Sequence, residues 1–127
     1  KGKRNIVWGE AIRGGMSDST IVMSWRGKSA GVKAAKHGNQ VIMAPRFTCY
    51  FDYPQNTKDK KHAWWMTYTP LKKVARFNPK SKKLSAKQNR NIIGGEATLW
   101  TEYVTNEGEL WHQLMPRLKA FGDALKK

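Results

Sequence analysis

The stretch TIVMSW, residues 20–25, is β-branched and apolar on both of its faces. Such a run predicts a strand of a parallel sheet that is covered on both sides, because a strand with one solvated face alternates apolar and polar residues. The residues that follow, KSAGVKAAKHG (28–38), predict a short helix with Ser29 as its N-cap and Gly38 as its C-cap. A strand followed directly by a helix is the unit from which parallel sheets are built.

Three other segments have the composition of short strands. They are NIVWGE (5–10), QVIMAP (40–45) and IIGGEATLW (92–100). Residues 107–125 space their apolar side chains as a helix does, and Pro116 predicts a break inside that helix. This alternation predicts an α/β fold with a parallel sheet, in a chain long enough for one hydrophobic core. The longest connection between strands runs from Arg46 to Asn91.

The chain is strongly basic, with a net charge of +15 from 24 Lys and Arg against 9 Asp and Glu. This balance favours a polyanionic partner such as nucleic acid, an anionic polysaccharide or an acidic surface. Much of the charge, however, lies in two segments of turn-like composition, 56–64 and 78–90, where lysine is more often solvated than part of a binding surface. A nucleic-acid-binding module is one alternative, because Trp64 and Trp65 stand in a Lys-rich loop that could combine base stacking with phosphate contacts.

The sequence gives little support for a disulfide, a metal site, a membrane span or a secretory segment. Cys49 is alone and can form no intrachain disulfide, while His37, His62 and His112 lack the spacing of metal ligands, so we expect no metal and no cofactor. No apolar run approaches the about 20 residues that span a bilayer, so we expect no membrane partner. The chain begins at Lys1 without an apolar secretory segment, and we expect a processed product or a piece of a longer protein.

An aromatic residue and a charged residue stand at or just after the end of each predicted strand. The pairs are Trp8 with Glu10, Trp25 with Arg26, Tyr50 with Asp52, and Trp100 with Glu102. The carboxyl ends of parallel strands meet at one edge of a sheet, where α/β proteins keep their binding sites. Indole rings stack on the apolar faces of a pyranose, and carboxylates accept hydrogen bonds from its hydroxyl groups. The pattern therefore predicts a sugar pocket, with the three tryptophans as walls and the two carboxylates, Asp52 and Glu102, as acceptors.

Five segments occur in a fixed order: IVWGE, TIVMSWRG, AAKHGNQVIMAP, CYFDYPQ and IIGGEATLWTEYV. In that order they resemble the C-terminal half of the catalytic barrel of family 20 glycoside hydrolases, the β-N-acetylhexosaminidases, and the terminal MPRLKAFGDAL is similar to the family's last barrel helix. The resemblance implies a (β/α)8 TIM barrel, of which residues 1–127 form one partial domain with strands five to eight and the last helix. It also implies a secreted, periplasmic or lysosomal location.

The resemblance further implies substrate-assisted retaining hydrolysis of terminal N-acetylglucosamine or N-acetylgalactosamine from glycans, in which the sugar's 2-acetamido oxygen attacks its own anomeric carbon. In that scheme Tyr50 is catalytic and holds the acetamido carbonyl. The substrate-binding residues are Trp8, Trp25 and Trp100, which enclose the sugar, and Asp52 and Glu102, which accept from its 4- and 6-hydroxyls. Glu96, which lies nearer the start of the predicted strand, is expected to be structural.

One part of the family's machinery is missing from the chain. The family transfers its proton with an adjacent Asp-Glu pair, in a segment like His-x-Gly-Gly-Asp-Glu, and no two acidic residues are adjacent in residues 1–127. The resemblance places that segment before Lys1. We therefore expect the chain to be inactive by itself and to have the N-terminal remainder of the barrel as its partner. A non-catalytic carbohydrate-binding remnant is the second alternative.

Overall fold

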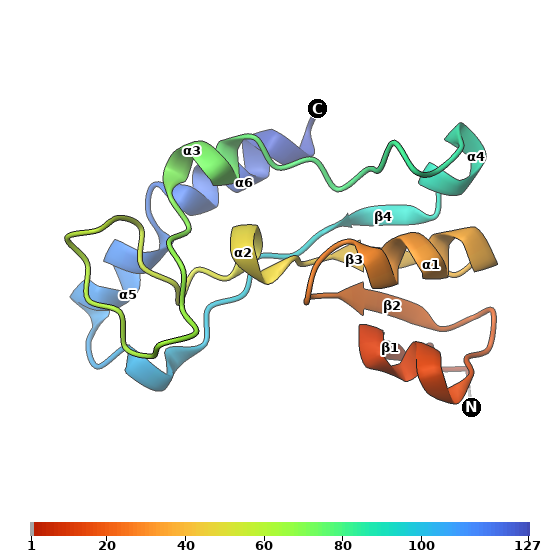
Figure 1. Ribbon diagram of the computed structural model, residues 1–127, viewed down its shortest axis with the longest axis horizontal. Helices are drawn as coiled ribbons and strands as arrows, with labels where there is room; N and C mark the ends of the chain where they lie inside the picture. Colours follow the sequence, from red (N-terminus) through yellow and green to blue (C-terminus); the bar gives the residue numbers. More distant parts are fainter. Residues whose placement is uncertain (1) are drawn as a thin grey trace. The chain divides into compact units, whose positions relative to one another are not determined.

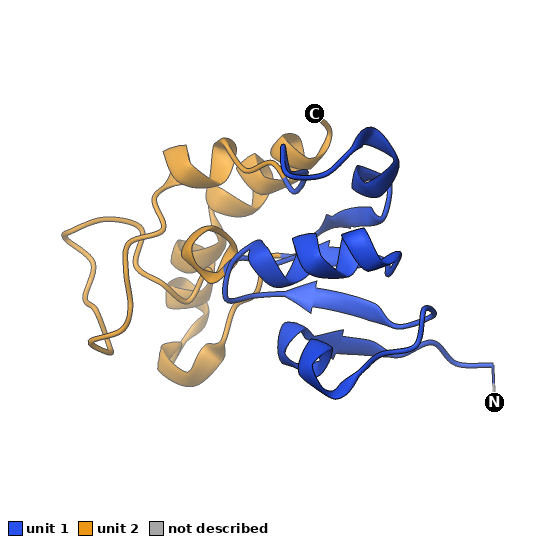
Figure 2. Cartoon of the chain, turned by 45° about the vertical axis from the view of Figure 1, so that its right-hand side comes forward, with its two compact units in different colours: residues 1–45, 79–96 blue, residues 46–78, 97–127 orange. Residues whose placement is uncertain are grey.

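The computed structural model describes residues 2–127, which form α/β elements in the order shown in Figure 1. The chain divides into two compact units, drawn in different colours in Figure 2. The first unit contains residues 2–45 and 79–96, and the second contains residues 46–78 and 97–127. The expectation that both belong to one partial domain stays a prediction. In residues 2–127 there is no helix of the length and apolarity that crossing a membrane requires.

The first unit is built on a four-stranded parallel sheet. Its strands are β1 (Ile6–Trp8), β2 (Ile21–Ser24), β3 (Val41–Met43) and β4 (Ile92–Gly95), and they pair in sequence order. All four residues of β2 are buried, as the apolar pattern on both of its faces predicts. The predicted α/β fold with a parallel sheet is thereby confirmed.

Three helical segments accompany this sheet: the 3-10 helix η1 (Gly9–Gly14), α1 (Ser29–His37) and the single turn α4 (Ala86–Asn89). Helix α1 packs against β2 and β3 (Figure 1), and a Cβ atom added at Gly31 would lie 2.7 Å from the Met43 side chain. Glycine at that position therefore allows the close approach of α1 to β3. Gly38 ends α1 with a φ of 109° and donates its backbone N–H to Ala34 and Ala35, which confirms the predicted C-cap.

The predicted N-cap of α1 is wrong. Ser29 is the first helical residue, Lys28 occupies the cap position, and no side chain of that residue caps the helix. The reason is a hydroxyl from the preceding strand: Ser24 Oγ, at the end of β2, accepts the Gly31 backbone N–H at 2.8 Å and donates to the Gly27 carbonyl at 2.6 Å. A long-range side chain thus satisfies an amide of the first turn that a local cap would otherwise satisfy.

The second unit is mainly helical. Its elements are α2 (Arg46–Cys49), α3 (Leu71–Ala75), the 3-10 helix η2 (Thr101–Tyr103), α5 (Glu107–Leu114) and α6 (Arg117–Leu125). The C-terminal helix breaks between Leu114 and Arg117, as Pro116 predicts. The ring centre of Phe121, on α6, lies 5.3 Å from that of Phe77 and 6.1 Å from that of Phe51, and all three rings belong to the unit's buried core.

The fourth predicted strand, 92–100, is shorter than expected. It ends at Gly95, and Trp100 lies beyond it. The backbone of Thr98 explains the difference, because it pairs with the segment after α2 instead of continuing the ladder. Thr98 N–H donates to the Cys49 carbonyl at 2.9 Å, and Phe51 N–H donates to the Thr98 carbonyl at 2.7 Å. Glu96 also stands after the strand rather than near its start, with its backbone N–H on the Met43 carbonyl at 3.1 Å.

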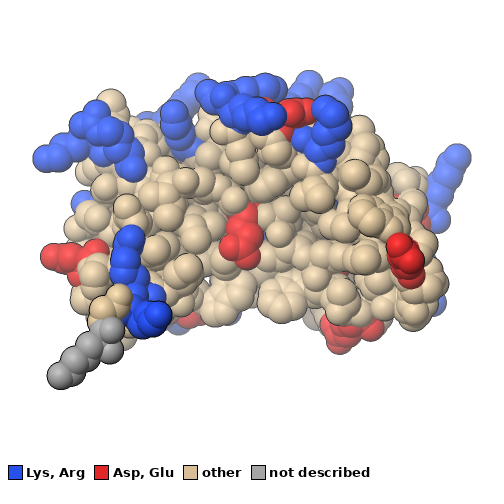
Figure 3. All heavy atoms as spheres, turned by 180° about the vertical axis from the view of Figure 1, so that it is seen from behind, with Lys and Arg blue, Asp and Glu red and all other residues tan. Residues whose placement is uncertain are grey.

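The charge-rich segments 56–64 and 78–90 consist of turns and irregular backbone, except for the single turn α4. The lysines of both segments are exposed, as expected for solvated loops. On the face drawn in Figure 3, Lys and Arg side chains project mainly at the margins, and most of the surface between them carries no charge.

Candidate functional site

The predicted site residues fall into two clusters, one in each unit. The first, which we call the Trp25 cluster, consists of Trp8, Glu10, Trp25 and Arg26. The second, the Tyr50 cluster, consists of Tyr50, Asp52, Trp100 and Glu102. Neighbouring strand ends explain the first grouping, because the pairing of β1 with β2 sets Trp8 beside Met23, two residues before Trp25.

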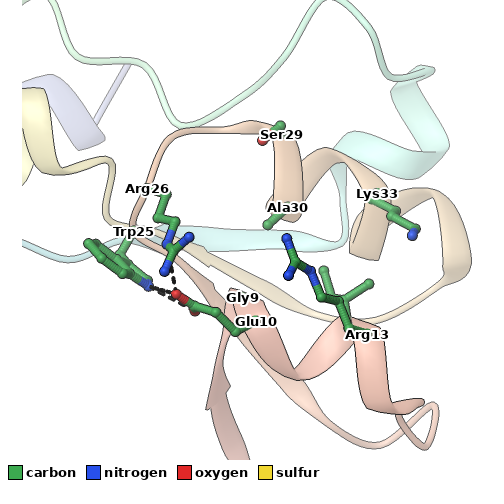
Figure 4. A pocket seen from close by; sticks show the side chains of 9 residues that line it. Gly9, Glu10, Arg13, Trp25, Arg26, Ser29, Ala30 and Lys33 are labelled. Atoms are coloured by element: carbon green, nitrogen blue, oxygen red, sulfur yellow. Dashed lines mark hydrogen bonds and ion pairs between the residues drawn. The ribbon is translucent and has the colours of Figure 1, made fainter.

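In the Trp25 cluster, a carboxylate holds an indole ring in place. Trp25 Nε1 donates to both oxygens of Glu10, at 2.9 and 3.0 Å (Figure 4). Arg26 Nε lies 2.9 Å from Glu10 Oε1, and its guanidinium lies 5.1 Å from the Trp25 ring centre. Trp8 meets Trp25 edge to face, with ring centres 6.3 Å apart. The two tryptophans that were expected to form sugar-binding walls therefore contact each other.

The electrostatics of Glu10 follow from these contacts. The hydrogen bond from Trp25 is the main cause that holds the pKa of Glu10 below its ordinary value, and Arg26 adds to it. Glu10 is therefore ionised at neutral pH and already occupied by two donors. Such a carboxylate is suited to orienting its neighbours and unsuited to donating a proton.

Beside this cluster a pocket of about 290 Å³ opens between η1 and the start of α1 (Figure 4). Its lining includes the cations Arg13, Arg26 and Lys33 together with Glu10 and Trp25. The sequence places η1 this close to α1 through Gly9, where a Cβ atom would lie 2.9 Å from the Ala30 Cβ. Any larger residue at position 9 would force the two segments apart.

The Tyr50 cluster is more deeply buried. Tyr50 is 7% exposed, and its ring centre lies 6.4 Å from that of Trp100 and 5.9 Å from that of Tyr53. The parallel bridge between Tyr50 and Thr98 brings the residues after α2 alongside the residues before η2. Trp100 keeps half of its surface exposed, and Glu102, on η2, is exposed.

Burial changes the acid–base properties of Tyr50 and Asp52, the two members of the cluster that follow α2. It raises the pKa of Tyr50 to about 12, so the phenol is protonated at neutral pH and can donate a hydrogen bond. Burial likewise raises the pKa of Asp52 to about 6, against the opposing effects of backbone hydrogen bonds and of Arg117. Asp52 Oδ1 is buried and has no hydrogen-bond partner within residues 2–127. The cluster thus offers a phenol that can donate a hydrogen bond. It also offers one carboxylate oxygen, Asp52 Oδ1, whose capacity to accept hydrogen bonds is unused.

The sequence analysis missed the roles of two residues, Glu10 in the Trp25 cluster and Arg117 beside the Tyr50 cluster. The sequence named Glu10 as a charged neighbour of Trp8 and gave it no role, although it holds Trp25. Arg117, whose contacts with the Tyr50 cluster are described below, was taken only as part of the last helix. A signal for Arg117 does exist, because it lies four residues before the buried Phe121 and so falls on the inner face of α6.

The model of glycosyl hydrolase family 20, catalytic domain, matches residues 1–125. The chain belongs to this family. It is 37% identical over 123 residues to the beta-hexosaminidase of Porphyromonas gingivalis, with 96% of this chain and 16% of that protein covered. It is 31% identical over 122 residues to the beta-hexosaminidase of Vibrio furnissii, with 94% of this chain and 20% of that protein covered.

A solved structure of the same family gives a close structural match. The exo beta-N-acetylglucosaminidase from Vibrio harveyi, in complex with N-acetylglucosamine, matches 98% of this chain with a TM-score of 0.85 and 29% identity. The match covers 20% of that chain, so the present sequence spans only a small part of its relatives' length. The match over residues 1–125 confirms the predicted family.

Proposed function

We propose that this chain is the C-terminal part of a β-N-acetylhexosaminidase barrel, with strands five to eight and the last helix. The intact protein would remove terminal N-acetylglucosamine or N-acetylgalactosamine from glycans by substrate-assisted retaining catalysis. The observation that carries this proposal is the Tyr50 cluster, where a protonated phenol stands two residues from a buried carboxylate oxygen without a protein partner. A pyranose bearing an acetamido carbonyl and free hydroxyl groups provides both an acceptor and a donor.

In this mechanism Tyr50 acts on the acetamido group. Its hydroxyl donates to the acetamido oxygen and holds that oxygen against the anomeric carbon, where it attacks as the glycosidic bond breaks. The leaving oxygen takes a proton from a general acid outside this chain, and the sugar becomes an oxazolinium ion. Water then adds to the anomeric carbon and gives up a proton to the same group outside this chain, the ring of the oxazolinium ion opens to restore the acetamido group, and the configuration is retained.

The aromatic residues form the walls of the proposed site. Trp8, Trp25 and Trp100 would enclose the acetamido methyl group and the apolar face of the ring. Trp8 and Trp100 are 43% and 49% exposed, so each offers apolar surface that a sugar can cover. Glu10 would keep the Trp25 ring in a fixed orientation through its two hydrogen bonds.

The carboxylates of Asp52 and Glu102 would recognise the positions of the sugar's hydroxyl groups. Asp52 and Glu102 would accept hydrogen bonds from the 4- and 6-hydroxyl groups, and charged acceptors form the stronger class of such bonds. The unused oxygen of Asp52 supports this role, because a buried carboxylate oxygen without a partner is costly unless a ligand supplies one.

The test of the proposal is to assay the purified chain with a chromogenic N-acetylglucosaminide, alone and mixed with the separately purified segment encoded upstream. We expect turnover from the mixture and none from either piece, because the adjacent Asp-Glu pair is absent here. A mixture made with the Tyr50→Phe chain is the matched control and should be nearly inactive.

Three results would contradict the proposal. Turnover by the isolated chain, abolished by replacing one of its own carboxylates, would place the general acid within residues 1–127. Binding of N-acetylglucosamine by the mixture without any turnover would instead support a carbohydrate-binding remnant. Binding of polyanions that weakens steeply as salt rises would support the nucleic-acid alternative.

A further inference from the structure

Arg117, the first residue of α6, is a fully buried cation with 0% of its surface exposed. Within residues 2–127 no carboxylate lies within ion-pair distance of its guanidinium. Burial lowers the pKa of Arg117 to about 10, so the side chain still carries its charge at neutral pH. Arginine is almost never buried without a specific partner, and this one therefore calls for an explanation in terms of what its donors contact.

The donors of Arg117 are directed at backbone carbonyl groups. Nη2 donates to the Phe51 carbonyl at 2.6 Å, and Nη1 donates to the Tyr53 carbonyl at 2.8 Å. Nη1 also reaches the Thr69 carbonyl at 3.1 Å, while Nε donates to the Gln113 carbonyl at 3.0 Å. A planar guanidinium presents five N–H groups in a fixed fork, so it can hold several carbonyl groups in one geometry, which a lysine cannot do.

Two of these carbonyls belong to the residues on either side of Asp52. The segment 51–53 is turn-like backbone outside every strand, so no ladder of hydrogen bonds fixes it beyond the bridge at Tyr50. The guanidinium takes the place of such a ladder, and it also lies 4.8 Å from the Phe51 ring centre. The direction of the Asp52 side chain depends on the backbone at 51–53, which Arg117 holds from both sides.

We propose that Arg117 is a positioning residue of the sugar site, which clamps the carbonyls of Phe51 and Tyr53 and so aims the Asp52 carboxylate at a sugar hydroxyl. The inference rests on the proposed function, in which Asp52 accepts that hydroxyl. Arg117 itself touches no substrate. Its effect is on discrimination between sugars, since a carboxylate that points in the wrong direction no longer recognises the hydroxyl group.

The experiment measures kcat/KM of the intact protein for a chromogenic N-acetylglucosaminide and for its 4-deoxy and 6-deoxy analogues. We call the ratio of kcat/KM for the parent sugar to kcat/KM for a deoxy analogue the deoxy penalty of that analogue. The Asp52→Asn variant first shows which hydroxyl Asp52 contacts, because the penalty of the analogue that lacks this hydroxyl shrinks in the variant. Arg117→Lys then keeps the charge and removes the fork. We expect the same penalty to shrink about 10-fold in Arg117→Lys, within the range expected for one buried hydrogen bond.

The ratio of kcat/KM for the parent sugar to that for the deoxy analogue distinguishes a positioning role of Arg117 from a purely structural one. A purely structural role lowers the amount of folded protein and reduces both rates together, which leaves the ratio unchanged. Gln113→Ala, which removes the 2.7 Å contact between Gln113 Oε1 and Arg117 Nη2, is the milder second variant and should shift the ratio in the same direction. Arg76→Lys, at an exposed arginine after α3 in the same unit, is the matched control and should leave the ratio at its wild-type value.

The possible failures are distinguishable. If Asp52→Asn leaves both deoxy penalties intact, Asp52 reads no hydroxyl, and both that part of the proposed function and the inference are overturned. If Asp52→Asn removes a penalty that Arg117→Lys and Gln113→Ala both retain in full, the proposed function stands and the inference alone is wrong.

Discussion

The Trp25 cluster and the Tyr50 cluster each place a carboxylate among aromatic rings, yet the pKa values of Glu10 and Asp52 are shifted in opposite directions. Glu10 accepts from an indole and a guanidinium, and these contacts hold its pKa below the ordinary value. Asp52 is half-buried, has one buried oxygen without a partner within residues 2–127, and has a pKa raised to about 6. The comparison shows that residue type and position at a strand end do not define a role. A carboxylate with satisfied hydrogen bonds orients its neighbours, and one with an unused oxygen suits a ligand.

The cations of the two clusters differ in the same way. Arg26 is 67% exposed and pairs with Glu10, so the Trp25 cluster is held by contacts between side chains. Arg117 is buried and donates to backbone carbonyls, so the Tyr50 cluster is held through its main chain. Main-chain anchoring fixes a segment more firmly than an exposed ion pair, whose contribution is small in water. We therefore expect substitutions in the Tyr50 cluster to lower the catalytic rate more than substitutions in the Trp25 cluster.

The largest expected effect is that of Tyr50→Phe in the intact protein. The hydroxyl's bond to the acetamido oxygen should strengthen toward the transition state, so its loss should lower kcat about 100-fold or more and change KM little. Steady-state kinetics with a chromogenic N-acetylglucosaminide provide the measurement. Tyr53→Phe, which removes the same atom from the neighbouring buried tyrosine, is the control and should have a much smaller effect. Wild-type kcat in Tyr50→Phe would remove the catalytic assignment.

The fold could be predicted largely because its signals are local. The apolar run around Val22, the glycine at position 38 and the break at Pro116 each act through their own segment, and all three appear in the structure. The errors arose where a distant residue took over a local role. Ser24 supplied the hydrogen bond expected from Ser29, and Thr98 paired with the segment after α2 instead of extending β4.

The site shows the same division between local and distant information. Parallel strand ends predict that Trp8 and Trp25 lie at the same edge of the sheet, and the structure brings these rings into contact. The states of the carboxylates could not be predicted, since they depend on which donors reach them and on how deeply the backbone buries them. Arg117 was missed for the same reason. Two of its partners are backbone carbonyls more than 60 positions earlier in the chain, and because every residue has a carbonyl, the sequence does not show which ones accept from a given arginine.

An effect of intermediate size, on inhibitor binding, would show which carboxylates contact the ligand. In the intact protein, Asp52→Ala and Glu102→Ala should each weaken binding of N-acetylglucosamine-type inhibitors about 5- to 150-fold, because a sugar hydroxyl loses its acceptor in a partly dry site. Glu96→Ala is the control, since that residue is expected to be structural and should chiefly alter stability. Inhibition constants for the three variants provide the measurement, and equal losses from all three would mean that the ligand residues are misassigned.

The smallest expected effect concerns stability, and there the two carboxylates should respond with opposite signs. The folded-state pKa of Asp52, about 6, lies above its ordinary value of 3.8, so the fold favours the protonated group and loses stability as pH rises between these values. Asp52→Asn, which resembles the protonated form, should therefore raise the Tm of the intact protein at pH 7.5 by about 2–4 °C. The gain should become small near pH 3.5, where the wild-type group is protonated in the folded state and mostly protonated in the unfolded state.

Glu10 provides the opposite case, because its folded-state pKa lies below the ordinary value of 4.5. Its ionised form stabilises the fold above that ordinary pKa, and the contribution is lost as pH falls through the lower folded-state value. Glu10→Gln keeps one acceptor for Trp25 and loses the charge, so it should lower the Tm at pH 7.5 by about 1 °C, with the difference closing in acid. Thermal unfolding of both variants at pH 7.5 and 3.5 decides the matter. Shifts of the same sign at pH 7.5 would show that the two carboxylates are held in similar environments, and the contrast between the clusters would then have no energetic basis.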